Sequence, residues 1–298
     1  MSGTRPSIAI ELVRAMRPQH WVKNVFVLAP LIFAQQLEHG ASVTRVMAAF
    51  GLFCIVASAV YLVNDVADRD ADRLHPHKRS RPIASGTVPA GLAVGAAVVL
   101  VLTALAAAAV LNDKLLTILA AYFLINVSYS LGLKRVVVLD VMLLSSGFLL
   151  RAWAGAAVID VTLSHWLVLC TGLISLFLGV VKRRQEIVAL DAHAVEQRPI
   201  LKEYSLPFLD QMISTVTAGT VVAYALYAFS PEVADKLGTK WMGLTIPFVV
   251  FGIFRYLYLV YQRHEGQNPT ALLLRDRPTL VNLALWAAVS LFALYGGF

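Results

Sequence analysis

Charged residues are scarce in this 298-residue chain. Asp, Glu, Lys and Arg together make up 14% of it, whereas a soluble domain averages about 25%. Hydrophobic residues make up 58%, and the mean hydropathy is +0.71. This balance excludes an ordinary soluble domain and predicts an all-α polytopic membrane protein.

Cysteine and histidine are also too few, or too scattered, for a soft-metal site. The two cysteines, Cys54 and Cys170, each lie in an apolar run, which gives no metal-binding pattern and no reason to expect a disulfide. The seven histidines show no HExxH or paired-ligand spacing. A zinc site is therefore not expected.

Apolar runs of spanning length predict nine transmembrane helices in one domain that covers residues 1–298. No internal repeat or soluble appendage interrupts them. The predicted spans are 22–37, 44–63, 91–111, 115–131, 137–157, 165–181, 207–229, 241–261 and 279–297.

The Lys and Arg residues predict which side each loop occupies. With residues 1–20 as a cytoplasmic N-terminal segment, 19 of the 25 Lys and Arg fall on the cytoplasmic side and 4 on the other. This bias supports an inside N-terminus in the cell (inner) membrane. Because the long polar loops then face the cytoplasm, an active site built from them would open there. The basic residues follow topology, so a nucleic-acid partner is not expected.

One polar stretch, Asn64 to Pro82, follows the second apolar run with four Asp and five Lys or Arg. If the helix continues, Asp65, Asp68 and Asp72 share one face within about 60°, with Asn64 at its edge. Asp70 points the other way. Three stacked carboxylates need a cation, and oxygen-only ligands suit Mg²⁺ or Mn²⁺ bridged to a phosphorylated substrate. The alternative is a solvated, charged loop.

Polar residues within two spans call for a second explanation. Lys23 and Asn24 lie one turn into the first run, where they either contribute to a site or snorkel to the interface. Asp140 and Arg151 lie about 16 Å apart along the fifth span. They are too far apart to pair, so they are expected to line a polar cavity, or else to pair with other segments.

If the Asp stretch binds a metal and a phosphorylated substrate, cations elsewhere in the chain are candidates for binding the phosphates. Lys78 and Arg81 follow the Asp cluster directly. Lys182 and Arg183 end the sixth span, where the simpler explanation is topology and helix-dipole complementation. Arg275 and Arg277 precede the last span, and spacing alone assigns them no role.

Asn64-Asp65-x-x-Asp68-x-x-x-Asp72, continued by K-R-S-R-P-I-A-S-G (78–86), resembles the first aspartate-rich motif of the UbiA family of intramembrane prenyltransferases. The likeness extends over essentially the whole chain and implies a UbiA-like helical bundle. The family's second motif is matched by four residues, but its second Asp is Leu144 here. The matching residues are Tyr129, Lys134, Arg135 and Asp140.

Further segments resemble the branch of this family that acts on decaprenyl phosphate. They are R-P-x-x-W-V-K-N, L-L-R-A-x-A-G, V-K-R and L-R-D-R. This resemblance implies transfer of 5-phosphoribose from 5-phosphoribosyl 1-diphosphate to a polyprenyl phosphate, with Arg151, Lys182, Arg183, Arg275 and Arg277 matching the pattern. The product would feed cell-wall arabinose synthesis. The acceptor's tail would lie in an apolar groove reached from the bilayer.

Two other functions remain open at this stage. A prenyltransferase that joins a prenyl diphosphate to an aromatic acceptor would need the same Asp motif. A transporter would also place ionisable residues in spans, but the sequence shows no paired broken helices in two halves. The sequence leaves a homo-oligomer open.

Overall fold

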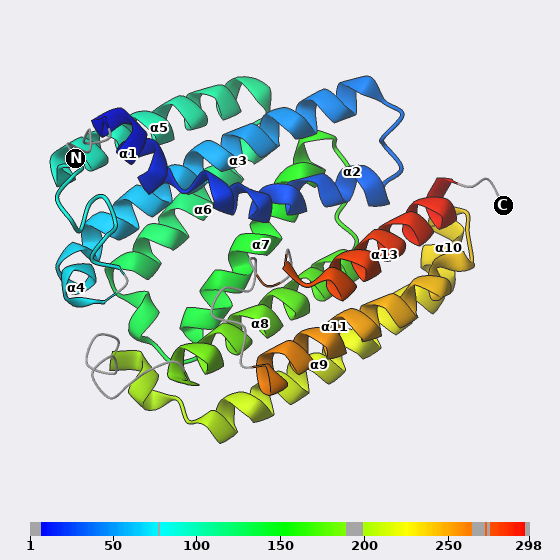
Figure 1. The fold of residues 1–298 in the computed structure, drawn as a ribbon. Helices are drawn as coiled ribbons and strands as arrows, with labels where there is room; N and C mark the ends of the chain where they lie inside the picture. The colour runs from blue at the N-terminus through cyan, green and yellow to red at the C-terminus, as the bar shows by residue number, and fades with distance from the viewer. Residues whose placement is uncertain (1–6, 77, 189–198, 264–271, 273–274, 296–298) are drawn as a thin grey trace. The chain divides into compact units, whose positions relative to one another are not determined.

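The structure, a computed structural model, describes residues 7–76, 78–188, 199–263, 272 and 275–295 (Figure 1). Every regular element in these ranges is a helix, which confirms the all-α fold class. Within the described ranges, eight helices are long and apolar enough to cross a membrane. They are α3 (Gly40–Ala67), α5 (Ala90–Leu111), α6 (Asp113–Leu131), α7 (Leu139–Val158), α8 (His165–Val188), α9 (Leu206–Phe229), η5 with α11 (Trp241–Gln262) and α13 (Arg277–Tyr295).

The first predicted span takes a different form from the other eight. It consists of a 3₁₀ helix, η1 (Pro18–Leu28), followed directly by a five-residue α-helix, α2 (Ala29–Phe33). Pro30 lies at this junction and has no N–H to donate, so a continuous α-helical ladder cannot run through it. The remaining short helices are α1 (Ile8–Met16), α4 (Arg69–Leu74), η2 (Leu133–Arg135), η4 (Pro199–Glu203) and α10 (Pro231–Leu237).

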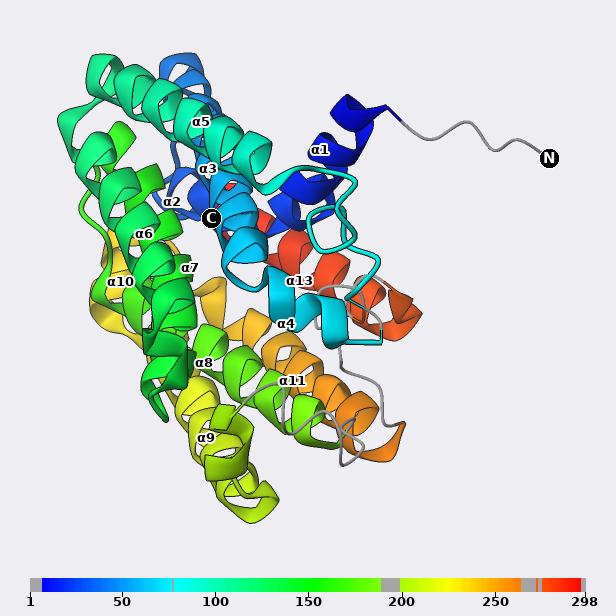
Figure 2. The same cartoon turned by 90° about the vertical axis from the view of Figure 1, so that its left-hand side faces the viewer.

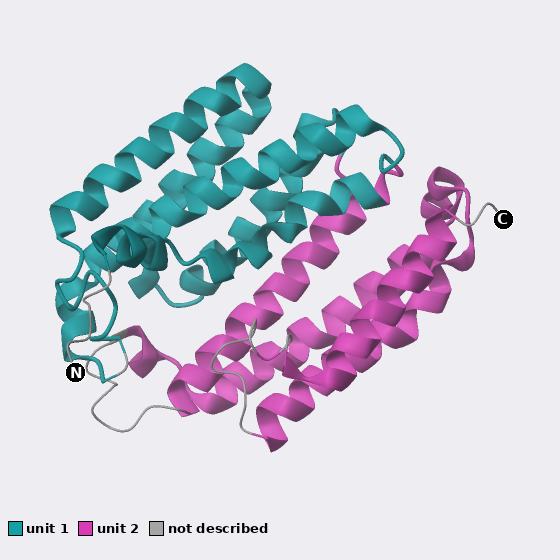
Figure 3. Ribbon diagram, turned by 45° about the horizontal axis from the view of Figure 1, so that its top comes forward, with its two compact units in different colours: residues 1–32, 36–162 teal, residues 33–35, 163–298 magenta. Residues whose placement is uncertain are grey.

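Clustering of the backbone divides the chain into two compact units (Figure 3). Unit 1 comprises residues 1–32 and 36–162, and unit 2 comprises residues 33–35 and 163–298. The expectation of a single domain over residues 1–298 stays a prediction.

Small side chains let the helices of unit 1 approach closely. On α5 the buried residues Ala93, Ala97, Ala104 and Ala108 recur at helical spacing and form one stripe. The stripe lies against α3, alongside which α5 runs in Figure 2. Alanine at such positions favours close packing of helices within a membrane. The apolar core of unit 1 therefore forms around α3, which ends in the aspartate-rich stretch.

Unit 2 is built from α8, α9, η5, α11 and α13, and polar side chains connect three of them. The Tyr224 hydroxyl on α9 lies 2.8 Å from Oγ1 of Thr245 and accepts a hydrogen bond from Nε1 of Trp286 on α13 at 3.1 Å. Each group is satisfied by another, as polar atoms inside a membrane bundle require.

Candidate active site

The aspartate-rich stretch lies at a helix break. α3 ends at Ala67, and Asp68 adopts φ −95° and ψ 4° before α4 begins at Arg69. The expected continuous helix is therefore interrupted at Asp68. Even so, the side chains of Asp65 and Asp72 are 2% and 5% exposed, whereas that of Asp70 is 80% exposed. The prediction that Asp70 points away from the other carboxylates is confirmed.

Two of the buried carboxylates converge on one cation. Nη1 of Arg81 donates to Oδ1 of Asp65 at 3.2 Å and to Oδ2 of Asp72 at 2.6 Å. Arg81 follows the cluster in the turn-rich segment that leads to α5. A single nitrogen held between two carboxylates from either side of the break marks a position where a cation is favoured.

Arg17 is a member of this cluster that the sequence argument missed. Its Nη2 donates to Oδ1 of Asp65 at 2.5 Å, and its guanidinium lies 5.0 Å from the centre of the Tyr61 ring. It sits between α1 and η1 in the left-handed conformation, with φ 56°. In sequence it appears only as one of the basic residues before the first span. Its place beside Pro18 in the R-P-x-x-W segment was the signal that could have singled it out.

The short loop after α6 also reaches the aspartate-rich stretch. Nζ of Lys134 in η2 donates to Oδ1 of Asp68 at 2.5 Å. Ser130, near the end of α6, donates to Oδ1 of Asn64 at 3.0 Å. Lys134 and Asn64, both expected at the site, thus lie next to the carboxylates. Unit 1 therefore assembles an acidic cluster matched by cations from three different segments.

The other expected residues of unit 1 lie in three settings. Asp140 is fully buried at the start of α7, and Asn24 is fully buried in η1. Lys23, Lys78 and Tyr129 are partly exposed. Arg151 is buried and donates to Asn24.

The expected cations of unit 2 have their own surroundings. Arg183 is 1% exposed and donates to Glu186 at 2.5 Å, while Nζ of Lys182 lies 3.9 Å from the same carboxylate. Arg275 and Arg277 are exposed on either side of Asp276.

Asp276 fixes the start of α13. Arg255, a charged residue within the α11 span, donates to both of its carboxylate oxygens at 3.1 and 2.8 Å. Thr279 donates to the same carboxylate through its backbone N–H and its hydroxyl, at 3.0 and 2.7 Å. These bonds, Arg255 first, hold the pKa of Asp276 well below its usual range.

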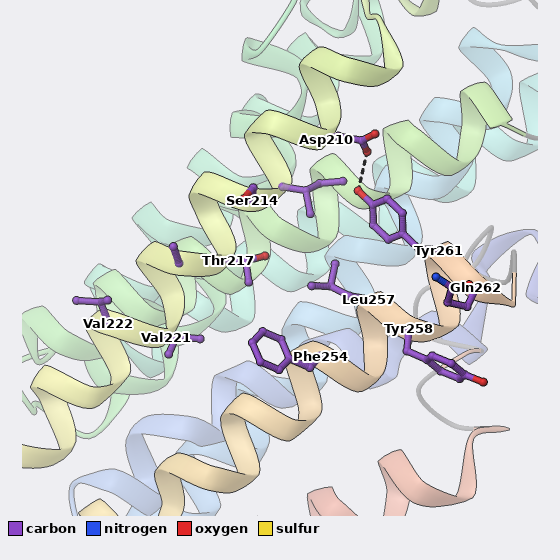
Figure 4. A pocket seen from close by; sticks show the side chains of 12 residues that line it. Asp210, Ser214, Thr217, Val221, Val222, Phe254, Leu257, Tyr258, Tyr261 and Gln262 are labelled. Carbon is purple, nitrogen blue, oxygen red and sulfur yellow. Dashed lines mark hydrogen bonds between the residues drawn. The ribbon is translucent and has the colours of Figure 1, made fainter.

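Unit 2 also contains a largely apolar groove of about 850 Å³ along α9 and α11 (Figure 4). Val221, Val222, Phe254 and Leu257 line its apolar part. At one end, Asp210 accepts hydrogen bonds from the Tyr261 hydroxyl at 2.6 Å and from Arg184 at 2.5 Å. No pattern in the sequence predicts that Tyr261 and Arg184 meet at Asp210.

The chemistry of the acidic cluster suits a hard divalent cation. Its donors are carboxylate oxygens only, and two of them already flank one positively charged nitrogen. Among the described residues, no group of three or more His, Cys, Asp or Glu side chains is arranged so that it could hold a metal ion as it stands. Asp65 and Asp72 therefore form the core of a fitting site, and Asp68 would have to exchange its contact with Lys134 to join them.

Comparison with known proteins defines the class of this fold and cluster. Residues 25–275 match the UbiA prenyltransferase family, and the chain belongs to that family of membrane-embedded transferases. It is 34% identical over 305 residues to the decaprenyl-phosphate phosphoribosyltransferase of Mycolicibacterium smegmatis, covering 99% of this chain and 95% of the relative. It is 36% identical over 282 residues to the enzyme of that name from Mycobacterium tuberculosis H37Rv, covering 93% and 92%.

Solved structures agree on the fold. A UbiA homolog from Archaeoglobus fulgidus bound to GPP and Mg²⁺ superposes with a TM-score of 0.74 at 18% identity, covering 95% of this chain and 99% of that one. A UbiA homolog from Aeropyrum pernix K1 gives a TM-score of 0.62 at 15% identity, covering 92% and 96%. The eight apolar spans among the described residues and the family match identify a multi-pass membrane protein.

Proposed function

We propose that this protein transfers 5-phosphoribose from 5-phosphoribosyl 1-diphosphate to a polyprenyl phosphate, decaprenyl phosphate in the relatives' names, and releases diphosphate. The observation that carries the proposal is the acidic cluster at Asp65 and Asp72, matched by Arg17, Arg81 and Lys134. The names of the relatives support the donor and the acceptor.

The carboxylates Asp65, Asp68 and Asp72 would hold Mg²⁺, with Mn²⁺ as a substitute. When bound, the metal would neutralise charge on the leaving diphosphate. Arg17 and Arg81 contact these carboxylates, and Lys78 lies three residues before Arg81 in the chain. These three cations would hold the remaining diphosphate oxygens.

The reaction makes modest demands on proton transfer. The acceptor phosphate is already an anion, so its oxygen can attack C1 of the ribose as the C1–O bond to diphosphate breaks. Charge neutralisation and positioning are then the main requirements, as in phosphoryl transfer. This agrees with the carboxylates and cations that make up the cluster among the described residues.

The rest of the two substrates would place two further demands on the protein. The 5-phosphate of the donor needs a separate cationic group, and Lys182, Arg183, Arg275 and Arg277 are the candidates. The groove along α9 and α11 is largely apolar and would suit a hydrocarbon tail. By the charge bias, the site opens to the cytoplasm from the inner membrane.

Transfer of a prenyl group to an aromatic acceptor is the second candidate, because a related fold is known with GPP and Mg²⁺. Thermal protection of the purified chain separates the two. With Mg²⁺ present, phosphoribosyl diphosphate should raise the unfolding temperature more than geranyl diphosphate does at equal concentration, since bound ligand stabilises the folded state. Greater protection by geranyl diphosphate would favour the prenyltransferase.

A further inference from the structure

Arg151 is a buried cation within a membrane span. It is 6% exposed on α7, and all three of its guanidinium nitrogens have protein acceptors. Nε donates to Oδ1 of Asn24 at 2.7 Å, Nη1 to the Gly147 carbonyl at 2.7 Å and Nη2 to the Tyr122 hydroxyl at 2.9 Å. These acceptors are neutral, so the guanidinium is held by geometry rather than by a carboxylate.

Aromatic rings complete the enclosure. The centre of the Arg151 guanidinium lies 4.9 Å from the Tyr122 ring, 5.3 Å from the Phe148 ring and 5.8 Å from the Phe53 ring. Ring faces stabilise a desolvated cation. Since each of the three nitrogens already donates to a protein atom, three of the five N–H groups of the guanidinium are committed to the protein's own structure.

Asn24 connects this cation to η1. It is fully buried, and it accepts from Arg151 while its Nδ2 donates to Sγ of Cys54 at 3.2 Å. One side chain of the 3₁₀ helix is thus fixed to α7 on one side and to α3 on the other.

A second contact one turn along α7 fixes the backbone of η1. Gly155 follows Arg151 by four residues, so both lie on the same helical face. A Cβ at Gly155 would clash with the carbonyl oxygen of Val27, three residues after Asn24. Two neighbouring positions of α7 therefore hold two neighbouring positions of η1.

The start of η1 is where this docking reaches the candidate active site. Arg17 immediately precedes the helix at φ 56°, a conformation that a non-glycine residue keeps only when its surroundings enforce it. From there its guanidinium reaches Asp65 at 2.5 Å. We infer that Arg151 is a positioning residue that, through Asn24, docks η1 and so places Arg17 on Asp65.

This inference rests on the proposed function only in taking the Asp65 cluster as a metal and diphosphate site. It assigns Arg151 a different task from direct binding of a substrate phosphate, which is what a cation in that sequence pattern would otherwise be expected to do. The two tasks predict different effects when Arg151 is replaced by lysine. A phosphate-binding cation keeps much of its effect as lysine, whereas lysine cannot make three divergent bonds to Asn24, Gly147 and Tyr122.

The test measures binding of inorganic diphosphate to the purified full-length chain in Mg²⁺ by titration calorimetry. Arg151→Met, Arg151→Lys and Asn24→Leu should each weaken binding about tenfold, as expected for loss of a hydrogen bond from a charged group. Adding Arg17→Ala to any of them should cause little further loss, because the same contact has already been disturbed.

Tyr122→Phe is the matched control. It removes one bond from Arg151 but leaves the link to η1, so it should lower the unfolding temperature without changing diphosphate affinity. Recovery of wild-type affinity by Arg151→Lys alone would overturn the inference in favour of direct anion binding. The inference would also be overturned if the affinity losses of Arg17→Ala and Arg151→Met multiplied in the double variant. An equal loss of affinity in Tyr122→Phe would show a general structural role instead.

Thermal unfolding in detergent decides the matter without any ligand. Arg17→Ala should lower the unfolding temperature of the wild type more than that of Arg151→Lys, and equal shifts would contradict the positioning role. If wild-type protein binds no diphosphate in Mg²⁺, the proposed function fails, and this second comparison still judges Arg151. If Arg151→Met does not fold, Arg151→Lys and Asn24→Leu carry both measurements.

Discussion

Arg17 donates a hydrogen bond to Asp65 at 2.5 Å across 48 positions of the chain. The Asp65 side chain is 2% exposed and that of Arg17 is 18% exposed, so water screens the pair only weakly. The contact joins the segment before the first span to the end of α3, and it puts a cation that the motif does not contain beside the motif's first Asp.

Arg17→Ala should therefore impair both stability and donor binding. Arg81 still contacts Asp65, so the free energy of unfolding should fall by about 1.5–3 kcal/mol, the value of one charge-assisted hydrogen bond. Donor affinity should fall roughly 10- to 150-fold by the same argument. Arg14→Ala is the control, because Arg14 is exposed and pairs only at 3.6 Å with Glu11. Equal effects in both variants would show that the Arg17 contact has no special role.

The carboxylates should differ sharply in their importance. Asp65→Asn and Asp72→Asn should abolish Mg²⁺-dependent transfer without unfolding the chain, because these two carboxylates, on either side of Arg81, form the core of the proposed metal site. Asp68→Asn should do so if Asp68 exchanges Lys134 for the metal. Asp70→Asn should be mild, since Asp70 bonds only to the exposed neighbours Arg69 and Arg73 among the contacts described. Activity at saturating Mg²⁺ measures this, and a severe Asp70→Asn with a mild Asp65→Asn would refute the assignment.

The Asp276 pair predicts a pH dependence of stability. Arg255 holds the folded-state pKa of Asp276 below the unfolded value of about 3.9. The pair therefore stabilises the fold above about pH 4, and this contribution is lost as the pH falls below that value toward the lower folded-state pKa.

Asp276→Asn should accordingly lower the unfolding temperature at pH 6, and the difference from wild type should shrink as the pH falls below about 4. Asp160→Asn serves as the control, because Asp160 pairs with Lys114 in an exposed setting, with side chains 65% and 69% exposed. A gap between wild type and Asp276→Asn that stays constant from pH 6 to pH 3 would mean that ionisation of Asp276 is not the source of its effect.

The charge bias predicts the topology. Reporters placed at Lys78 and after Phe298, a residue outside the described ranges, should lie on opposite sides of the membrane, with Lys78 in the cytoplasm. Reporters on the same side would contradict the predicted arrangement of nine spans.

The fold was predictable because it depends on runs of hydrophobic residues, which sequence displays directly. The exposure of Asp70 also agrees with the prediction, although the continuous helix on which that prediction rested is interrupted at Asp68. The break at Asp68 was not predictable, because the chain there turns to meet Arg81 and Lys134, which are distant in sequence. Arg17 was missed for a similar reason: its R-P-x-x-W segment marks it in the sequence, but neither its φ of 56° nor its contact 48 positions away can be inferred from that segment.

Arg151 shows a related limit. Its place in a span indicated that it needs polar partners, but not which ones. Asn24 was recognised as unusually deep, yet only the fold shows that the two side chains bond at 2.7 Å. Pairings between helices depend on how the helices rotate and approach, which spacing along one helix does not determine.

The most direct test of the proposed reaction follows label from donor to lipid in membranes or detergent with Mg²⁺. Ribose-labelled phosphoribosyl diphosphate with polyprenyl phosphate should give labelled lipid and free diphosphate, and Asp65→Asn should abolish the transfer. Labelled geranyl diphosphate with an aromatic acid should give no product. Transfer of the prenyl label together with no transfer of ribose would contradict the phosphoribosyltransferase assignment.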